Sequence, residues 1–363
     1  MGKTDVEGRL RLVLRNVEEV VTEDELRGLI EAGCGKGYLG FEPSGLFHVG
    51  WLVWAFKFKD LVDAGFRMSL LAATWHAWIN DKLGGDMGLI RFAARHVADV
   101  LNGLGLEGRY SLVYAEDLVS DVRYWEKLLK VAKASSLARV KRALTIMGRK
   151  SEEGEKDFSK LIYPLMQVTD IFHMDLDVAL GGMDQRRAHM LARDVADKLK
   201  WKKVVAIHTP LIPSLEGVGR MDVKALARGV VAAESKMSKS RPKSAIFILD
   251  SDEEIASKVA RAYCPPREVE GNPVLAMAKH VVFRGREVEF TIERPSRYGG
   301  PITVWRYEEL EELYRGGKIH PLDLKNAVAK SIIDIVRPLR ERILSAPGSR
   351  EAVESIRRYY EGE

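Results

Sequence analysis

The sequence has few of the features that mark secreted, disulfide-bonded or membrane proteins. It contains two cysteines, Cys34 and Cys264, which are far apart and match neither a disulfide framework nor a zinc-ligand spacing. Its apolar runs are too short to cross a bilayer, and its first residues lack the apolar core of a signal peptide. We therefore expect a cytoplasmic protein with no membrane attachment and no protein-bound metal.

Two common nucleotide-binding signatures are also missing. No P-loop sequence is present. Residues 35–40 match the GxGxxG pattern, but they precede and enter a predicted strand, whereas dinucleotide binding requires glycines that open a helix. A bound nucleotide must therefore be held in another way.

What is present indicates a two-domain globular protein with a basic surface. The 363 residues are 46% hydrophobic and 30% charged, with 57 Lys and Arg against 52 Asp and Glu. Between residues 123 and 150 one acid, Glu126, stands among nine bases: Arg123, Lys127, Lys130, Lys133, Arg139, Lys141, Arg142, Arg149 and Lys150. A solvated helix is the usual explanation of such a run. Because one acid cannot pair nine bases, we favour a helix that faces RNA phosphates.

Strand and helix patterns alternate through the first two thirds of the chain. Strands are predicted at residues 38–41, 68–73, 110–114, 177–180 and 204–207. Helices are predicted between them at residues 49–64, 87–104, 121–147, 158–173 and 183–199. This order predicts an α/β fold, a Rossmann-like doubly wound parallel sheet whose ligands lie beyond the carboxyl ends of the strands.

Both ends of the chain are predicted to be helical. An N-terminal helical arm precedes the sheet, and Thr22 and Glu25 have the spacing of a capping box. From residue 250 onward short irregular joins separate predicted helices at 253–263, 273–282, 307–315 and 321–344. We expect one domain over residues 1–249 and a mostly helical domain over 250–363, whose tail begins at Ser345.

Two short motifs combine into one hypothesis. His48-Val49-Gly50 stands where a strand turns into a helix, and Lys236-Met237-Ser238-Lys239-Ser240 follows a late strand. The pair resembles the signature of class I aminoacyl-tRNA synthetases. The resemblance implies attack of an amino-acid carboxylate on the α-phosphate of ATP, a reaction that needs positive charge around the phosphates.

Six longer phrases narrow the resemblance to the archaeal and eukaryotic tyrosyl-tRNA synthetases. They occur in family order at residues 38–45, 163–170, 181–185, 262–265, 269–273 and 320–328. The resemblance implies ligation of L-tyrosine to tRNA(Tyr) through a tyrosyl-adenylate, with ATP as a substrate and Mg²⁺ carried by its phosphates. It also implies a homodimer formed through an insertion at about residues 110–150, and an anticodon-binding role for residues 250–363.

The resemblance assigns candidate site residues. The tyrosine substrate would be held by Tyr38, Ala73, His76, Tyr163, Gln167, Asp170 and Gln185. Tyr38 and Asp170 match positions that hydrogen-bond the phenolic hydroxyl, whereas Tyr163, Gln167 and Gln185 match positions that hold the α-amino group. An acid among Met166, Val168 and Ile171 is costly to bury without a partner, which favours a site role for Asp170.

The remaining assignments concern ATP and tRNA. His48, Lys236, Lys239, Ser238 and Ser240 would be catalytic. ATP would contact Pro43, Gly45, His48, Gly50, Gly181, Gly182, Asp184 and Met237. The tRNA would contact Arg186, Arg187, Tyr298, His320 and Asp323.

Two departures from the family leave alternatives open. Trp51 stands where the signature commonly has a second histidine, and the segment from Glu216 to Glu234 is longer than usual, with a predicted helix at residues 223–232. The tryptophanyl enzyme shares both ATP motifs, so it is the nearest alternative. A catalytically silent tRNA-binding relative is the other alternative, motivated by Trp51.

Overall fold

The computed structural model describes residues 3–144, 156–217, 236–237, 244–346 and 348–362. The chain forms two compact units. The first comprises Met1–Gly45, Trp54–Thr209 and Ala346–Glu363, and the second comprises Leu46–Val53 and Pro210–Ser345.

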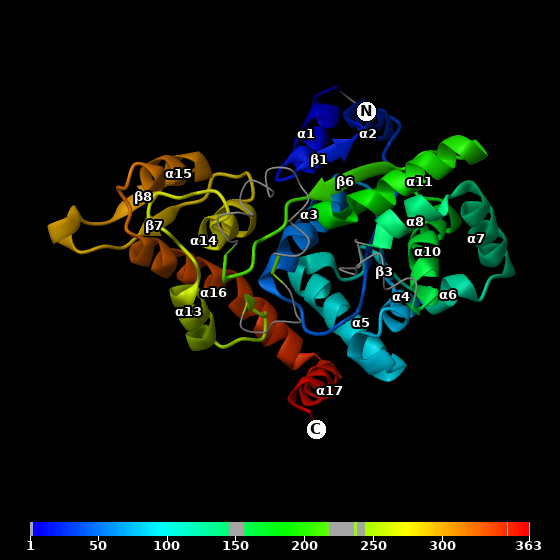
Figure 1. The fold of residues 1–363 in the computed structure, drawn as a ribbon. Helices are drawn as coiled ribbons and strands as arrows, with labels where there is room; N and C mark the ends of the chain where they lie inside the picture. Colours follow the sequence, from blue (N-terminus) through cyan, green and yellow to red (C-terminus); the bar gives the residue numbers. More distant parts are fainter. Residues whose placement is uncertain (1–2, 145–155, 218–235, 238–243, 347, 363) are drawn as a thin grey trace. The chain divides into compact units, whose positions relative to one another are not determined.

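The first unit contains a six-stranded sheet and its helices (Figure 1). Its strands are β1 (Glu19–Val21), β2 (Lys36–Phe41), β3 (Arg67–Ala72), β4 (Ser111–Tyr114), β5 (Val178–Gly182) and β6 (Val205–Thr209). Its α-helices are α1 (Lys3–Leu14), α2 (Glu23–Glu31), α3 (Leu52–Asp63), α4 (Thr74–Ile79), α5 (Met87–Leu101), α6 (Ala115–Val119), α7 (Val122–Ala134), α8 (Leu137–Ala143), α10 (Ser159–His173), α11 (Arg186–Leu199) and α17 (Ser349–Glu361), of which α3 starts in the second unit. Shorter helical turns are η2 (Lys82–Gly85), η3 (Asn102–Leu106) and η5 (Met183–Gln185).

The second unit is mostly helical. It contains η1 (Val49–Trp51), α13 (Asp252–Arg261), α14 (Pro273–Met277), η7 (Ala278–Phe283), η8 (Ser296–Tyr298), α15 (Tyr307–Arg315) and α16 (Pro321–Ser345). A two-stranded antiparallel sheet pairs β7 (Phe290–Ile292) with β8 (Ile302–Val304). No sequence pattern predicted this hairpin, because each strand has three residues, too few for a periodic pattern.

The predicted doubly wound sheet is confirmed. Its order is β1-β6-β5-β2-β3-β4, and every pairing is parallel except that of β1 with β6. Register places Tyr38 beside Ala179 and places Leu39 beside Leu70 and Leu180, on opposite faces of the sheet. All five side chains are buried, which means that both faces are covered, as parallel sheets require.

Helices α7, α10 and α11 cover the Tyr38 face. Their buried side chains include Tyr124 and Val131 from α7, Val168 from α10 and Val195 from α11, in one cluster with Tyr38. The prediction of a single helix over residues 121–147 is wrong, because α7 ends at Ala134 and a separate helix, α8, begins at Leu137. At this break the Ser136 side chain accepts a hydrogen bond from the Arg139 amide and caps the start of α8.

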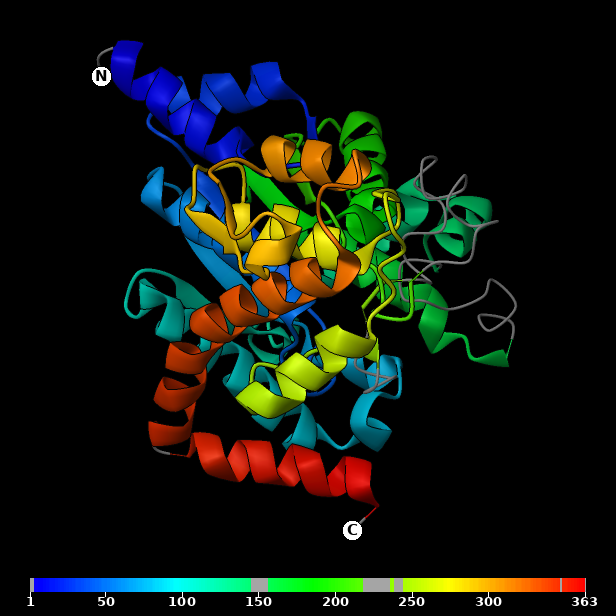
Figure 2. The same ribbon diagram turned by 90° about the vertical axis from the view of Figure 1, so that its left-hand side faces the viewer.

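The predicted N-terminal arm is confirmed. Figure 2 shows α1 and α2 lying side by side. Helix α2 begins at the predicted capping box, where the Glu25 amide donates to Thr22 Oγ1 at 3.3 Å and the Thr22 amide donates to Glu25 Oε2 at 3.2 Å.

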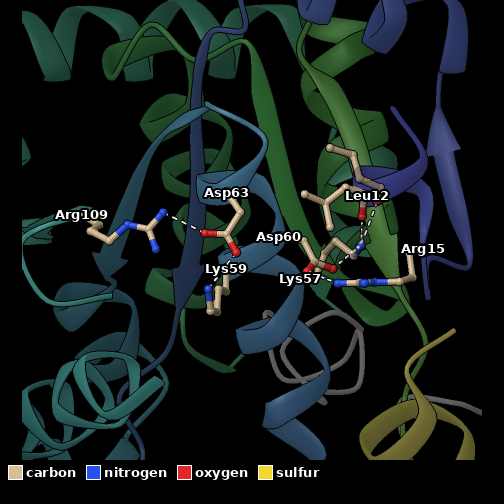
Figure 3. A network of polar contacts seen from close by, with 8 residues as sticks. Leu12, Arg15, Lys57, Lys59, Asp60, Asp63 and Arg109 are labelled. Carbon is tan, nitrogen blue, oxygen red and sulfur yellow. Dashed lines mark hydrogen bonds and ion pairs between the residues drawn. The ribbon is translucent and has the colours of Figure 1, made fainter. Parts of the chain in front are cut away.

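A buried lysine ties the arm to α3 (Figure 3). Lys57 Nζ donates to the carbonyl oxygens of Leu12 and Val13 at 3.1 and 2.9 Å and to Asp60 Oδ2 at 2.9 Å. Arg15 pairs with the other oxygen of Asp60. The carbonyl groups at the end of a helix lack partners within it, so the ammonium satisfies groups that would otherwise be unpaired. Burial lowers the pKa of Lys57 to about 8.

The contacts divide the chain differently from the predicted boundary at residue 250. The second unit takes in Leu46–Val53 and everything from Pro210 to Ser345, and the C-terminal tail returns to the first unit. Helix α17 lies beside α5 (Figure 1) and buries Ala352, Val353 and Ile356 completely or nearly so.

In the part of the chain that the structure describes, no helix has the length and apolar character needed to cross a membrane.

Candidate active site

The carboxyl ends of the central strands bring many of the predicted residues to one edge of the sheet. Along the chain, β2, β3 and β4 add strands to one side, whereas β5 and β6 add strands to the other side of β2. The direction of winding therefore changes between β2 and β5, where open α/β sheets bind their ligands. Pro43 follows β2, Ala73 follows β3, and Asp184 follows β5 within the first unit.

The predicted tyrosine-selecting residues form a buried polar cluster. Asp170 is 2% exposed and accepts a hydrogen bond from the Tyr124 hydroxyl at 2.8 Å. Its second oxygen lies 3.3 Å from His76 Nε2. Tyr38 is also 2% exposed, and burial followed by the nearby charge of Asp170 raises the pKa of its hydroxyl. The structure therefore brings Tyr38, His76 and Asp170 together.

Burial sets the protonation of this cluster. It raises the pKa of Asp170 to about 7, against the smaller lowering effect of the Tyr124 hydrogen bond. It lowers the pKa of His76 to about 4, so that this imidazole is neutral near pH 7. The cluster therefore holds hydroxyl groups, a neutral ring and a carboxyl group that titrates near neutrality. Such a group can both donate hydrogen bonds to a ligand and accept them from it.

Helix α10 also supplies the predicted contacts for an α-amino group. Tyr163 and Gln167 are four residues apart on α10, and the Tyr163 ring meets the His76 ring edge to face, with centroids 4.9 Å apart. Gln167 Nε2 donates to Gln185 Oε1 at 3.0 Å. Gln167 Oε1 is buried with no hydrogen-bond partner in the described part of the chain. A buried acceptor without a partner suits an ammonium donor.

The turn after β5 is closely packed. A Cβ atom on Gly181 would lie 2.9 Å from Gln185 Cβ and 3.1 Å from His189 Cε1. Glycine is therefore required at position 181 by the chain's own packing, which is a second reason besides the expected approach of adenosine. Gly182 and Asp184 are both half-buried at this turn.

The two ATP motifs meet within the second unit. His48 and Phe247 form an antiparallel bridge, in which the Val49 amide donates to the Ile246 carbonyl at 2.8 Å. A Cβ atom on Gly50 would lie 3.0 Å from His48 Nδ1 and 3.5 Å from Met237 Cβ. Gly50 and Met237, which are almost two hundred residues apart in sequence, are therefore close in space. A side chain at position 50 would crowd both motifs.

Trp51 packs beside His48. The two ring centroids are 5.4 Å apart, and Trp51 also meets Phe47 edge to face at 5.4 Å. The predicted helix at 49–64 is divided into η1 and α3, with His48 at the N-cap of η1. Lys236 is half-buried, and its backbone forms an isolated antiparallel β-bridge with Pro213. Ser238, Lys239, Ser240 and the predicted helix at residues 223–232 lie outside the described residues.

The predicted tRNA contacts lie in both units. In the first, Arg186 Nε donates to Glu19 Oε2 at 2.7 Å, and Arg187 is exposed. Glu19 also contacts His208 Nδ1 at 2.9 Å. The ion pair is partly exposed, and 43% of the Arg186 side chain remains accessible.

In the second unit, Tyr298 is 62% exposed, and the Arg297 guanidinium lies over its ring, 5.0 Å from the centroid. His320 is exposed, and its Nδ1 accepts from the Leu322 amide at 3.2 Å at the start of α16. Asp323 lies in the first turn of that helix. His320 therefore also serves as a helix cap.

The basic segment at residues 123–150 has more acidic partners than the sequence suggested. The premise that Glu126 alone faces nine bases is wrong, because Asp121 pairs with Arg123 and Asp194 of α11 pairs with Arg139. Lys127 Nζ donates to the Phe172 carbonyl at 3.0 Å. The same segment contains Tyr124, whose hydrogen bond to Asp170 no sequence pattern indicated.

Comparison with known proteins agrees with this geometry. Residues 35–337 match the model of the class I tRNA synthetases for tryptophan and tyrosine. The chain is 57% identical to the tyrosine–tRNA ligase of Aeropyrum pernix, over 98% of both chains, and 54% identical to that of Sulfolobus acidocaldarius, over 97% and 98%. The crystal structure of the Aeropyrum enzyme superposes with a TM-score of 0.85 at 52% identity, over 99% of this chain and 100% of that one.

A second solved structure is also similar. The tyrosyl-tRNA synthetase of Pyrococcus horikoshii in complex with L-tyrosine superposes with a TM-score of 0.86 at 39% identity, and 96% of this chain and 99% of that one are covered. The family resemblance predicted from the six phrases is confirmed. The chain belongs to the class I tRNA synthetases of the tryptophan and tyrosine family and, within it, to the archaeal tyrosyl-tRNA synthetases.

Proposed function

We propose that this chain ligates L-tyrosine to tRNA(Tyr) in the cytoplasm, with ATP as the activating substrate. The observation that carries the proposal is the buried group formed by Tyr38, Tyr124 and Asp170. A phenolic hydroxyl entering this group would find both a hydrogen-bond donor and an acceptor. Phenylalanine would leave these groups desolvated and unpaired. The chain is similar to tyrosine–tRNA ligases over nearly its full length. This similarity does not favour a tryptophanyl enzyme or a catalytically silent tRNA-binding relative.

Residues around the phenol would orient the rest of the amino acid. Gln167 Oε1 and the Tyr163 hydroxyl would accept hydrogen bonds from the α-ammonium group, and Gln185 would position Gln167 through their 3.0 Å hydrogen bond. Ala73 and His76 would line the pocket for the ring. Holding the amino acid at both ends fixes its carboxylate, and a fixed nucleophile lowers the entropic part of the barrier.

The ATP-binding residues would stabilise charge on the phosphates. His48, with Lys236 and Lys239, would neutralise the pyrophosphate leaving group, and Ser238 and Ser240 would donate hydrogen bonds. Pro43, Gly45, Gly50 and Met237 would shape the turns around the nucleotide. Gly181 and Gly182 would admit adenosine, and Asp184 would accept from a ribose hydroxyl. Mg²⁺ would arrive with the phosphates.

The second unit would read the anticodon. Tyr298 presents an exposed aromatic face on which an unstacked base can stack, and Asp323 can accept from a base amino group. His320 would lie beside them, and Arg186 and Arg187 of the first unit would contact the acceptor stem. In this proposal, each unit would contact one end of the tRNA.

The chain would act as a homodimer through the insertion at residues 110–150. This segment exposes large apolar side chains that a second copy could cover: Val122 is 80% exposed, Leu129 is 67% exposed and Leu137 is 60% exposed. Sedimentation at micromolar concentration should give a dimer, and replacing Leu129 with Asp should shift it toward monomer. A monomeric profile of the unmodified chain would contradict this assignment.

The function is tested by tyrosine-dependent exchange of pyrophosphate into ATP. The full chain should catalyse exchange with tyrosine, but not with tryptophan or phenylalanine. Tyr38→Phe should reduce discrimination between tyrosine and phenylalanine. Tyr110→Phe is the matched control, since Tyr110 donates to Asn102 away from the cluster. Exchange that depends on tryptophan, or no exchange by folded protein, would reject the proposal.

A further inference from the structure

The C-terminal helix reaches the turn that leads into the His48 motif. Tyr360, near the end of α17, donates its hydroxyl hydrogen to the Ser44 carbonyl at 2.8 Å. These residues are 316 positions apart in sequence, yet both belong to the first unit. The contact therefore joins the last turn of the chain to the segment between β2 and His48.

The same tyrosine packs against Gly45. This glycine has φ +132°, a conformation that side-chain-bearing residues rarely adopt. A Cβ atom built on Gly45 would lie 2.6 Å from Tyr360 Oη and 3.2 Å from Tyr360 Cε2. The phenol thus occupies the space beside the glycine while its hydroxyl binds the preceding carbonyl. One side chain fixes two consecutive residues of the turn.

Helix α17 is itself firmly anchored. Ala352, Val353 and Ile356 are at most 3% exposed, and the helix lies along α5. At its start the Ser349 hydroxyl donates to Asp99 of α5. The packing of α17 against α5 therefore fixes the position of Tyr360, although this residue lies near the end of the chain.

The held turn is also where the chain leaves the first unit. Gly45 is its last residue before Leu46–Val53, which carries His48 and Gly50 in the second unit. A backbone with φ near +132° has few steric restraints of its own at glycine, so an outside contact has most effect there. Tyr360 therefore acts on the one residue of this turn whose own conformation is least restrained.

We propose that Tyr360 is a positioning residue for ATP, which orders the Ser44–Gly45 turn of the first unit, where Pro43 and Gly45 are assigned to the ATP site. It does not touch the reacting atoms. The proposal rests on the assignment of Pro43 and Gly45 to the ATP site. It predicts that the C-terminal helix controls ATP use and leaves tyrosine binding unchanged.

Pyrophosphate exchange by the full chain tests this role. Tyr360→Phe should raise KM for ATP about three- to tenfold, the effect of one lost neutral hydrogen bond. Tyr360→Ala, which also loses the ring, should raise it further. KM for tyrosine should change less than about twofold, whereas a loss of packing alone would affect both substrates. Tyr359→Phe is the matched control, because that neighbouring ring contacts Gly84 instead.

A double-mutant cycle with Gly45→Ala gives an independent measure. The new methyl group collides with Tyr360 Oη in the otherwise unchanged chain, but not in Tyr360→Ala. The increase in KM for ATP caused by Gly45→Ala should therefore be smaller in the Tyr360→Ala background. Additive effects, or an unchanged KM for ATP in Tyr360→Ala, would overturn the proposal. Absence of tyrosine-dependent exchange in the unmodified chain would instead contradict the proposed function.

Discussion

Replacing Asp170 with Asn should change how stability depends on pH. Asp170 is 2% exposed, and burial raises its pKa from 3.8 to about 7. An asparagine keeps the size of the side chain and an oxygen that can accept from Tyr124 Oη. Its amide nitrogen can face His76 Nε2, which lies 3.3 Å from the present Oδ2. The variant therefore removes the titration while it conserves the packing.

Proton linkage gives the direction and the size of this effect of pH on the free energy of unfolding. Between pH 4 and 7 the unfolded chain releases the Asp170 proton before the folded chain does, so this group destabilises the fold as pH rises. The stability that it contributes is complete below pH 4 and is lost as pH rises through about 7. A pKa change from 3.8 to about 7 corresponds to roughly 4 kcal/mol, of which about 3 kcal/mol falls between pH 5 and pH 8.

Urea unfolding of both proteins at pH 5, 6, 7 and 8 measures this effect. The free energy of unfolding of Asp170→Asn minus that of the unmodified chain should rise by about 3 kcal/mol over this range. Asp175→Asn is the control, because a hydrogen bond from Lys202 lowers the pKa of Asp175 and leaves it ionised in both states at these pH values. A difference for Asp170→Asn that is constant with pH would refute the reasoning.

Three other substitutions test neighbouring parts of the structure. Tyr124→Phe removes the donor to Asp170, which should raise the pKa of that carboxyl further and move the acidic limb of kcat/KM for tyrosine to higher pH; pyrophosphate exchange against pH checks this. For Lys57→Met, burial lowers the lysine pKa from 10.5 to about 8, so the unmodified chain should gain about 3 kcal/mol relative to the variant between pH 8 and 10.5 in urea unfolding. Thr22→Ala should cost about 1 kcal/mol through loss of the α2 cap, whereas Thr22→Ser should restore it.

Local chemistry made much of the fold predictable. The strand and helix alternation fixed the sheet class, since each buried strand is a short apolar run between helical patterns. Thr22 and Glu25 identified a helix start because capping depends on residues three positions apart. The need of a buried acid for a partner drew attention to Asp170 in the sequence, and the structure supplies one, the Tyr124 hydroxyl.

Long-range contacts explain what the sequence could not show. Tyr124 reaches Asp170 across 46 residues, and it belongs to a helix whose charges suggested a different role. Asp121, which pairs with Arg123 of this helix, and Asp194, which pairs with Arg139 of α8, lie outside the segment that was counted. The return of Tyr360 to Gly45 depends on how α17 packs against α5, which no local pattern encodes.

The polar cluster is best explained by substrate selection, because it weakens the core that contains it. Tyr38, His76, Tyr124 and Asp170 are each at most 2% exposed, and burial moves the pKa of every one of them. Apolar residues of similar volume at these positions would avoid the desolvation of a carboxyl group and an imidazole. Sites that break the rules of stable packing are where function is expected. On the proposed function, a ligand with one hydroxyl on an aromatic ring would add hydrogen bonds to this cluster, so the site that is costly for the free chain would become favourable with tyrosine bound.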